Sequence, residues 1–97
     1  MKELYRAVDK VEDADIQAEG RFRPSPHGTE CKGFFFEEAS AKRFNDQEIA
    51  TGGLPRPIIV KALAPVKLIE NSPPHHAATE GRGVLIRNED LQKLELP

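Results

Sequence analysis

The segment of residues 33–50 constrains the fold more than any other part of this sequence. A glycine is followed by three phenylalanines at residues 34–36, and aromatic side chains favour the pleated, well-packed surface of a strand. Residues 38–50 then have helical spacing of their apolar side chains, and two consecutive glycines end them. The segment therefore predicts a strand that leads directly into a helix.

Capping and chain-breaking residues elsewhere in the sequence predict the order of the other elements. Asp9 and Glu12 form a capping-box pattern, in which each side chain satisfies a backbone donor at the start of a helix that Gly20 ends. This helix is acidic, as expected of a solvated outer face. We expect strands at 4–8, 21–23, 33–36, 56–64 and 83–87, helices at 9–20 and 38–50, a helical turn at 88–94, and mostly loop at 24–28 and 65–82.

This order predicts the fold class. The helices are too few and too irregularly placed for a doubly wound sheet. We therefore expect a small α+β domain with a mostly antiparallel sheet, two helices and a short C-terminal helical turn. With 97 residues there is room for one core, so residues 1–97 are expected to form a single domain.

Composition excludes several classes of protein. The balance of 14 Lys and Arg against 16 Asp and Glu argues against nucleic-acid binding through bulk charge, although a local basic patch stays open. A single cysteine excludes an internal disulfide framework, and with no His-x-x-x-His spacing we expect no metal site. No apolar run is long enough for a membrane span or a signal peptide. We expect a cytoplasmic protein, or one delivered into the cytoplasm of a target cell.

The middle segment resembles a signature of ADP-ribosyltransferases. The run from Lys32 to Phe36, followed by Ser40, Ala41 and Phe44, is similar to the pattern of the poly(ADP-ribose) polymerase and diphtheria-toxin branch. The layout of residues 4–60 also resembles small toxin modules at the C-terminal ends of bacterial polymorphic toxins, which begin with a similar Leu-Tyr-Arg-Ala-Val run.

The resemblance implies a function and a set of site residues. The activity would be transfer of ADP-ribose from NAD to a macromolecular target, with Arg6, Lys32 and Phe35 binding NAD. Phe35 occupies the place of a ring-stacking tyrosine, and Arg6 that of an early-strand signature residue. The family's late-strand glutamate falls near Arg82 or Gly83, which are not acidic, so Glu80 is the nearest candidate for the catalytic carboxylate.

The chemistry of this reaction explains why these residue types are needed. Positive charge develops at the sugar carbon bonded to nicotinamide, so a site needs a carboxylate near the ribose. It also needs a cation for the pyrophosphate, which an arginine grips bidentately, and a flat wall for the nicotinamide ring. The resemblance further implies a cognate immunity protein and a protein or RNA target, with no DNA expected.

Two other functions remain open from the residues alone. His75 or His76, with Lys32, Arg56 or Arg82, would suit a metal-independent ribonuclease, because histidine titrates near neutral pH and a cation can stabilise the phosphate transition state. Alternatively, the chain is a non-catalytic binding domain on the same scaffold. The basic stretch around Lys61 could meet RNA, a dinucleotide or an acidic partner, or it could simply protect a sheet edge.

Overall fold

The fold is organised around strand β1, Lys2–Val8, which lies between two partner strands. The computed structural model describes residues 1–24, 30–53, 55–75 and 82–97. One four-stranded sheet has the order β3-β1-β2-β4, with every neighbouring pair antiparallel. The other strands are β2 (Cys31–Phe35), β3 (Ile58–Ala64) and β4 (Gly83–Arg87).

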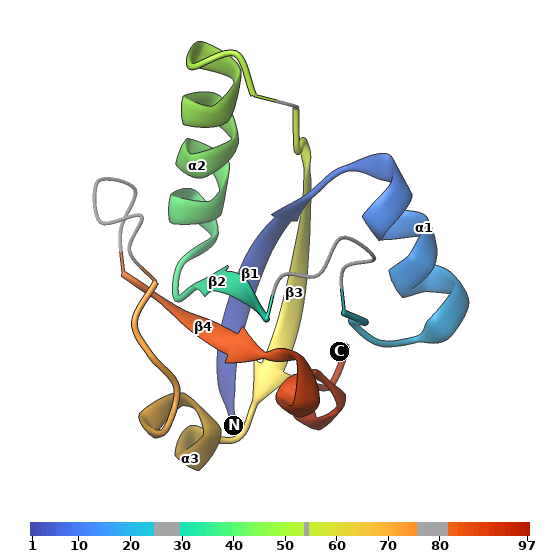
Figure 1. Ribbon diagram of the computed structural model, residues 1–97, viewed down its shortest axis with the longest axis vertical. Coiled ribbons are helices and arrows are strands. Elements are labelled where there is room, and N and C mark those ends of the chain that lie inside the picture. The colour runs from blue at the N-terminus through green and yellow to red at the C-terminus, as the bar shows by residue number, and fades with distance from the viewer. Residues whose placement is uncertain (25–29, 54, 76–81) are drawn as a thin grey trace.

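Strand β1 pairs unequally with its two neighbours. Its register with β3 runs without a break from Lys2↔Ala64 to Val8↔Ile58, whereas its register with β2 is the single pair Tyr5↔Phe35. The pair β2 and β4 accordingly crosses the pair β1 and β3 at a steep angle (Figure 1). The side chain of Arg6, next to the crossing point, can therefore reach strand β2.

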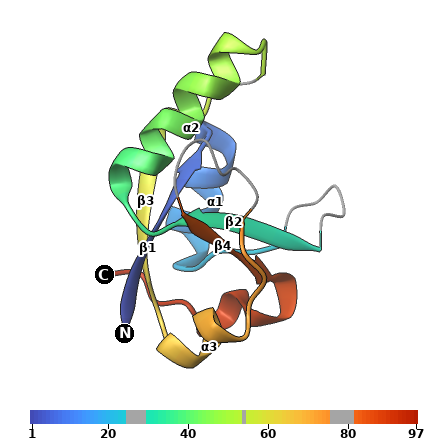
Figure 2. The same cartoon turned by 90° about the vertical axis from the view of Figure 1, so that its left-hand side faces the viewer.

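Helices lie on both sides of the sheet. Helix α1 (Lys10–Glu19) follows β1, and helix α2 (Glu38–Ala50) follows β2 and stands apart from α1 in Figure 1. Two shorter elements, helix α3 (Val66–Glu70) and the 3-10 helix η1 (Asn88–Lys93), lie at the opposite end of the molecule from α2 (Figure 2). The expected α+β class with a mostly antiparallel sheet is confirmed.

The three phenylalanines of the central segment are divided between two environments. Phe34 is buried in the main core, where its ring meets the edge of Phe22 at a centroid distance of 5.1 Å. Phe35 instead packs against Phe44 of α2, at 5.6 Å. Successive strand residues face opposite sides of a sheet, so the split follows from the pleat.

One expectation of local structure is wrong, and one short helix was not expected. Residues 21–23 form no strand, because Phe22 inserts into the core as a single anchor while Arg23 turns outward to pair with Asp15. The stretch 65–82, expected as mostly loop, also contains a short helix that the sequence did not predict: Pro65 precedes helix α3, and Leu68 is buried against the core. A helix of five residues is too short to leave a periodic signal.

The start of helix α1 confirms half of the expected capping box. The Asp9 carboxylate accepts a hydrogen bond from the backbone N–H of Glu12 at 2.8 Å, and Gly20 ends the helix with a φ of +69°. The side chain of Glu12 does not return to the helix start as the box requires. It turns inward, toward strands β1 and β2, because two cations lie there.

Short segments run alongside the two outer strands of the sheet. The backbone of residues 73–75 runs along β4, where Leu85 donates to the Pro73 carbonyl at 2.8 Å and His75 donates to the Gly83 carbonyl at 3.1 Å. Along β3, Leu63 and Glu95 exchange two backbone hydrogen bonds, at 2.7 and 2.9 Å. The first of these segments fixes the backbone position of His75.

Candidate functional site

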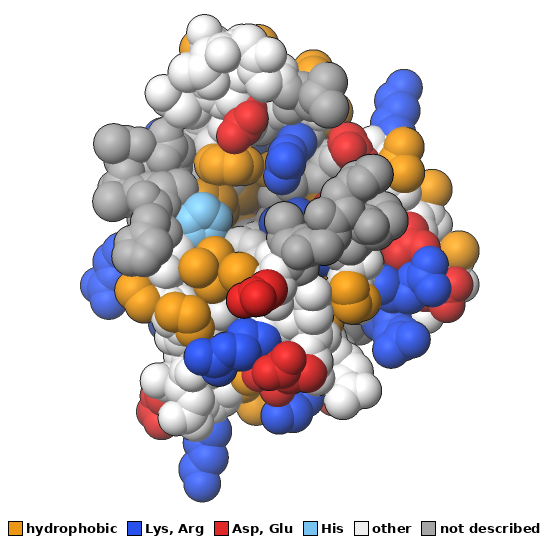
Figure 3. All heavy atoms as spheres, viewed as in Figure 1, with side chains coloured by type: hydrophobic (Ala, Val, Ile, Leu, Met, Phe, Trp, Pro, Cys, Tyr) orange, Lys and Arg blue, Asp and Glu red, His pale blue; other side chains and the backbone are white. Residues whose placement is uncertain are grey.

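A cavity of about 240 Å³ brings together residues from both pairs of strands and from helix α2. The side chains that line it and bear on its chemistry are Arg6, Lys32, Phe35, Phe44, Arg56 and His75. In the space-filling view, hydrophobic, histidine and cationic side chains gather around a hollow beside α2 (Figure 3). We refer to this cavity as the site cavity.

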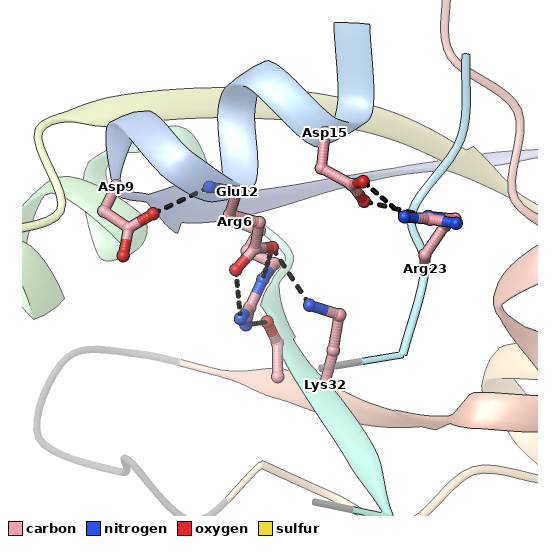
Figure 4. Close-up of polar contacts among 7 residues, drawn as sticks. Arg6, Asp9, Glu12, Asp15, Arg23 and Lys32 are labelled. Atoms are coloured by element: carbon pink, nitrogen blue, oxygen red, sulfur yellow. Dashed lines mark hydrogen bonds and ion pairs between the residues drawn. The ribbon is translucent and has the colours of Figure 1, made fainter. Parts of the chain in front are cut away.

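Arg6 is held by three hydrogen bonds. Its Nε and Nη2 donate to the two carboxylate oxygens of Glu12 at 2.7 and 3.1 Å, and its Nη1 donates to the carbonyl of Gly33 at 2.9 Å (Figure 4). The side chain is only 12% exposed. A guanidinium has five N–H donors, so these contacts fix the plane of the group and leave two donors for a ligand.

Lys32 adds a second cation to the same cluster. Its Nζ lies 3.4 Å from the Glu12 carboxylate, and the side chain is 4% exposed (Figure 4). Burial, together with the nearby charge of Arg6, lowers the pKa of Lys32 even though Glu12 acts against this shift.

Glu12 neutralises only part of this charge. Burial acts to raise the pKa of Glu12, but the hydrogen bonds and charge of Arg6, with the charge of Lys32, outweigh it and lower the pKa. One carboxylate therefore faces two cations, and the cluster of Arg6, Glu12 and Lys32 carries one net positive charge at the wall of the site cavity.

An aromatic wall forms another side of the cavity. The His75 ring lies 4.9 Å from that of Phe35, with an angle of 30° between the ring planes, and Phe44 contacts both rings. Gly33 makes this stacking possible, because a Cβ at that position would collide with the imidazole of His75. The wall is thus built from three rings on three separate segments.

Arg56 completes the cavity from the segment before β3. Its backbone N–H donates to Oδ1 of Asn45 at 2.6 Å, and its guanidinium carbon lies 5.9 Å from the centre of the Phe44 ring. Helix α2 therefore positions Arg56 through two neighbouring residues. Among the residues that the structure describes, no carboxylate forms an ion pair with Arg56, and its side chain lines the cavity.

The structure brings together four of the five predicted site residues. Arg6, Lys32, Phe35 and His75 all line the site cavity. Phe35 is 2% exposed, so it contributes to the wall together with the rings of His75 and Phe44 rather than as an open platform. Glu80, like His27 and His76, lies outside the described residues. Arg82 lies outside the site cavity and lines two adjoining hollows instead.

Sequence reasoning missed two residues of this site. The sequence predicts only a helix-capping role for Glu12, although a carboxylate one turn into a helix that follows an arginine-bearing strand can fold back onto that arginine. Asn45 gave no signal, because its role depends on where the segment before β3 comes to lie. Cys31 also lines the cavity and is half-buried.

The comparisons with known proteins add no relative: no family model, curated protein or solved structure matches this chain. Within the part of the chain that the structure describes, no group of three His, Cys, Asp or Glu side chains could hold a metal ion. In the same residues, no helix has the length and apolar character needed to cross a bilayer.

Proposed function

We propose that the site cavity binds NAD and that this chain is a toxin domain of the ADP-ribosyltransferase type. One observation carries the proposal: Arg6, Lys32 and Phe35, which the sequence resemblance assigns to NAD, line the same cavity although they come from two strands. A dinucleotide needs cations for its pyrophosphate and flat apolar walls for its rings. The site cavity offers both.

Each group has a separate task in this proposal. The unused N–H donors of Arg6, with Lys32 and Arg56, bind the pyrophosphate, and the wall of Phe35, His75 and Phe44 receives a ring. Glu80 supplies the carboxylate that stabilises positive charge on the ribose. The bond between the ribose carbon and nicotinamide breaks, a nucleophile of the target bonds to that carbon and loses its proton, and nicotinamide leaves.

The proposal also includes a protein partner. A cognate immunity protein would cover the cavity with acidic side chains that face Arg6, Lys32 and Arg56. The toxin would act on a protein or an RNA after delivery into the cytoplasm of a target cell.

NAD binding tests this proposal through the melting temperature of the domain. A ligand that binds only the folded state raises this temperature, so NAD should stabilise the wild type and stabilise Arg56→Gln much less. Arg21→Gln is the matched control, because Arg21 is exposed and does not line the cavity. Equal stabilisation of both variants would remove the cavity from the proposal.

Turnover of NAD tests the catalytic assignment separately. Release of nicotinamide should fall in Glu80→Gln and persist in Glu70→Gln, which removes an exposed carboxylate of helix α3. Binding without any turnover would support the alternative of a non-catalytic binding domain.

A metal-independent ribonuclease is the second candidate, favoured by the position of His75. Its ring lines the site cavity together with Lys32 and Arg56, as this chemistry requires. In such a reaction the ribose 2′-hydroxyl loses its proton as its oxygen attacks phosphorus, the bond to the 5′-oxygen breaks, and the leaving oxygen gains a proton. His75 would carry out one of these two proton transfers and water the other. If the wild type cleaves RNA in the presence of a chelator and His75→Gln does not, the result would support this candidate. The same cleavage in both proteins would exclude His75.

A further inference from the structure

The site cavity is the first of three hollows that adjoin in series. A second hollow, of about 330 Å³, shares His75 with the site cavity and is also lined by Phe36 and Arg82. A third, of about 400 Å³, shares Phe36 and Arg82 with the second and extends to Lys2 and Arg43 near the start of α2. Each hollow therefore adjoins the next through shared residues, and we refer to the three together as the path.

The charge along this path is strongly positive. Six cationic side chains line it: Arg6, Lys32, Arg56, Arg82, Arg43 and Lys2. Among the described residues the only carboxylate that lines it is Glu37, while Glu12 pairs with Arg6 and Lys32 from outside the lining and neutralises one of their two charges. The whole chain carries a net charge of −2, so the cations are concentrated here against the overall balance. Such a stripe attracts a polyanion.

Aromatic rings alternate with these cations. Phe44 and His75 lie in the first hollow and Phe36 lies between the second and third. The Lys2 ammonium lies 4.6 Å from the centre of the Phe36 ring. Proteins that bind single-stranded nucleic acid combine a basic groove for the backbone with aromatic side chains for the bases.

We propose that the path from the site cavity to the start of helix α2 binds single-stranded nucleic acid. Its cations contact the phosphodiester backbone, and unpaired bases stack on the rings between them. A duplex has no exposed base faces to offer these rings, and an acidic peptide supplies charge without planar bases. This binding surface extends beyond the NAD site and does not depend on turnover of NAD or on cleavage of RNA.

Binding of a labelled oligonucleotide tests the proposal. The probes are a twelve-nucleotide oligouridylate and the matching oligothymidylate, measured by fluorescence anisotropy at several salt concentrations in a chelator. For single strands the logarithm of the binding constant falls with that of the salt concentration by about 0.7 for each phosphate contact. Arg43→Gln with Arg82→Gln should therefore reduce this slope by about 1.4, which corresponds to roughly 25-fold weaker binding at 0.1 M salt.

The matched control removes the same charge elsewhere. Arg21→Gln with Lys93→Gln changes two exposed cations that do not line the path, so it should leave the slope within experimental error. Equal binding of the two oligonucleotides supports a contact to the shared backbone, and tighter binding of RNA supports an added contact to the 2′-hydroxyl. Equal slopes for both double variants, no binding by the wild type at low salt, or equally tight binding of polyglutamate would each overturn the proposal.

Failure of this proposal is distinguishable from failure of the proposed NAD site. Arg43 and Arg82 lie outside the site cavity, so their substitution should leave stabilisation by NAD unchanged. If the domain binds NAD but not oligonucleotides, the proposed NAD site stands and the nucleic-acid path is excluded. If it binds oligonucleotides but not NAD, the path stands and the NAD site is excluded.

Discussion

The guanidinium of Arg6 pairs with both carboxylate oxygens of Glu12, at 2.7 and 3.1 Å, across the turn between β1 and α1. The same carboxylate lies 3.4 Å from Lys32 of β2. A side chain from the first helix thus joins two strands whose backbones share a single register pair. Glu12 therefore has a structural role as well as an electrostatic one.

Removal of this carboxylate should destabilise the domain. Glu12→Gln leaves Arg6 and Lys32 close together without their shared anion, and we expect a loss of about 1 to 3 kcal/mol in the free energy of unfolding. Urea denaturation measures it. The control is Asp15→Asn. Asp15 lies on the same helix as Glu12, and its substitution removes an exposed ion pair with Arg23, which should cost less than about 1 kcal/mol. Equal losses would contradict the role assigned to Glu12.

The lowered pKa of Glu12 predicts an acid dependence of stability. The pKa of this group is lower in the folded state than its ordinary value of 4.5, so its stabilising contribution is complete above that value and is lost as pH falls through the folded pKa. Between about pH 6 and pH 3, the unfolding free energy of the wild type should therefore fall more steeply than that of Glu12→Gln. Parallel curves for the two proteins would show that Glu12 is not the group responsible.

The buried ammonium of Lys32 should contribute to binding without contributing to stability. Burial lowers the pKa of Lys32, which means that folding disfavours its charged form. We expect Lys32→Met to keep the unfolding free energy within about 1 kcal/mol of the wild type or to raise it. The same variant should lose most of its stabilisation by NAD. A loss of stability as large as that of Glu12→Gln would show that the ammonium is needed for the fold.

Gly33 should control the position of the His75 ring. A Cβ at residue 33 would collide with the imidazole, so Gly33→Ala should displace the ring from Phe35 and cost about 1 to 3 kcal/mol of stability. The His75 ring resonances in an NMR spectrum should shift as the stacking is lost. In a His75→Ala background the same glycine substitution should cost much less, because nothing remains to collide with. An undiminished cost in that background would assign the effect to the backbone of β2.

Asn45 should act on the cavity through Arg56. Its Oδ1 accepts from the Arg56 backbone N–H at 2.6 Å, so Asn45→Ala should cost about 1 kcal/mol of stability and weaken ligand binding as well. Asn71→Ala is the control, because that side chain also bonds a backbone group but lies at the C-terminal end of helix α3 and does not line the cavity. Only the first variant should change the salt slope of oligonucleotide binding or the response to NAD.

The sequence allowed the main elements to be predicted because their signals are local. Consecutive aromatic residues, a capping aspartate and paired glycines are local signals, and they located both long helices and a strand of the sheet. The sequence around Phe22 resembles a strand. One buried side chain between two arginines gives the same alternation of polar and apolar residues that a strand gives. Only the packing of Phe22 on Phe34 distinguishes the two cases.

The candidate site was harder to predict because its geometry is not local. The family resemblance assigns Arg6 and Lys32 to one site, but the crossing of β1 and β2 decides that a helix carboxylate fits between them. The stack of His75 on Phe35 depends on the segment beside β4, whose position is set by hydrogen bonds to Gly83 and Leu85. No spacing in the sequence encodes that contact.

The segments that run alongside β3 and β4 affect how this domain behaves at high concentration. Backbone groups of Leu63, Gly83 and Leu85 that would otherwise be open to a strand from another molecule are already bonded within the chain. Pro73 and Pro74 have no backbone N–H, so the segment that runs alongside β4 offers fewer hydrogen-bond donors to another strand. We therefore expect the sheet to resist growth by the addition of foreign strands at these positions.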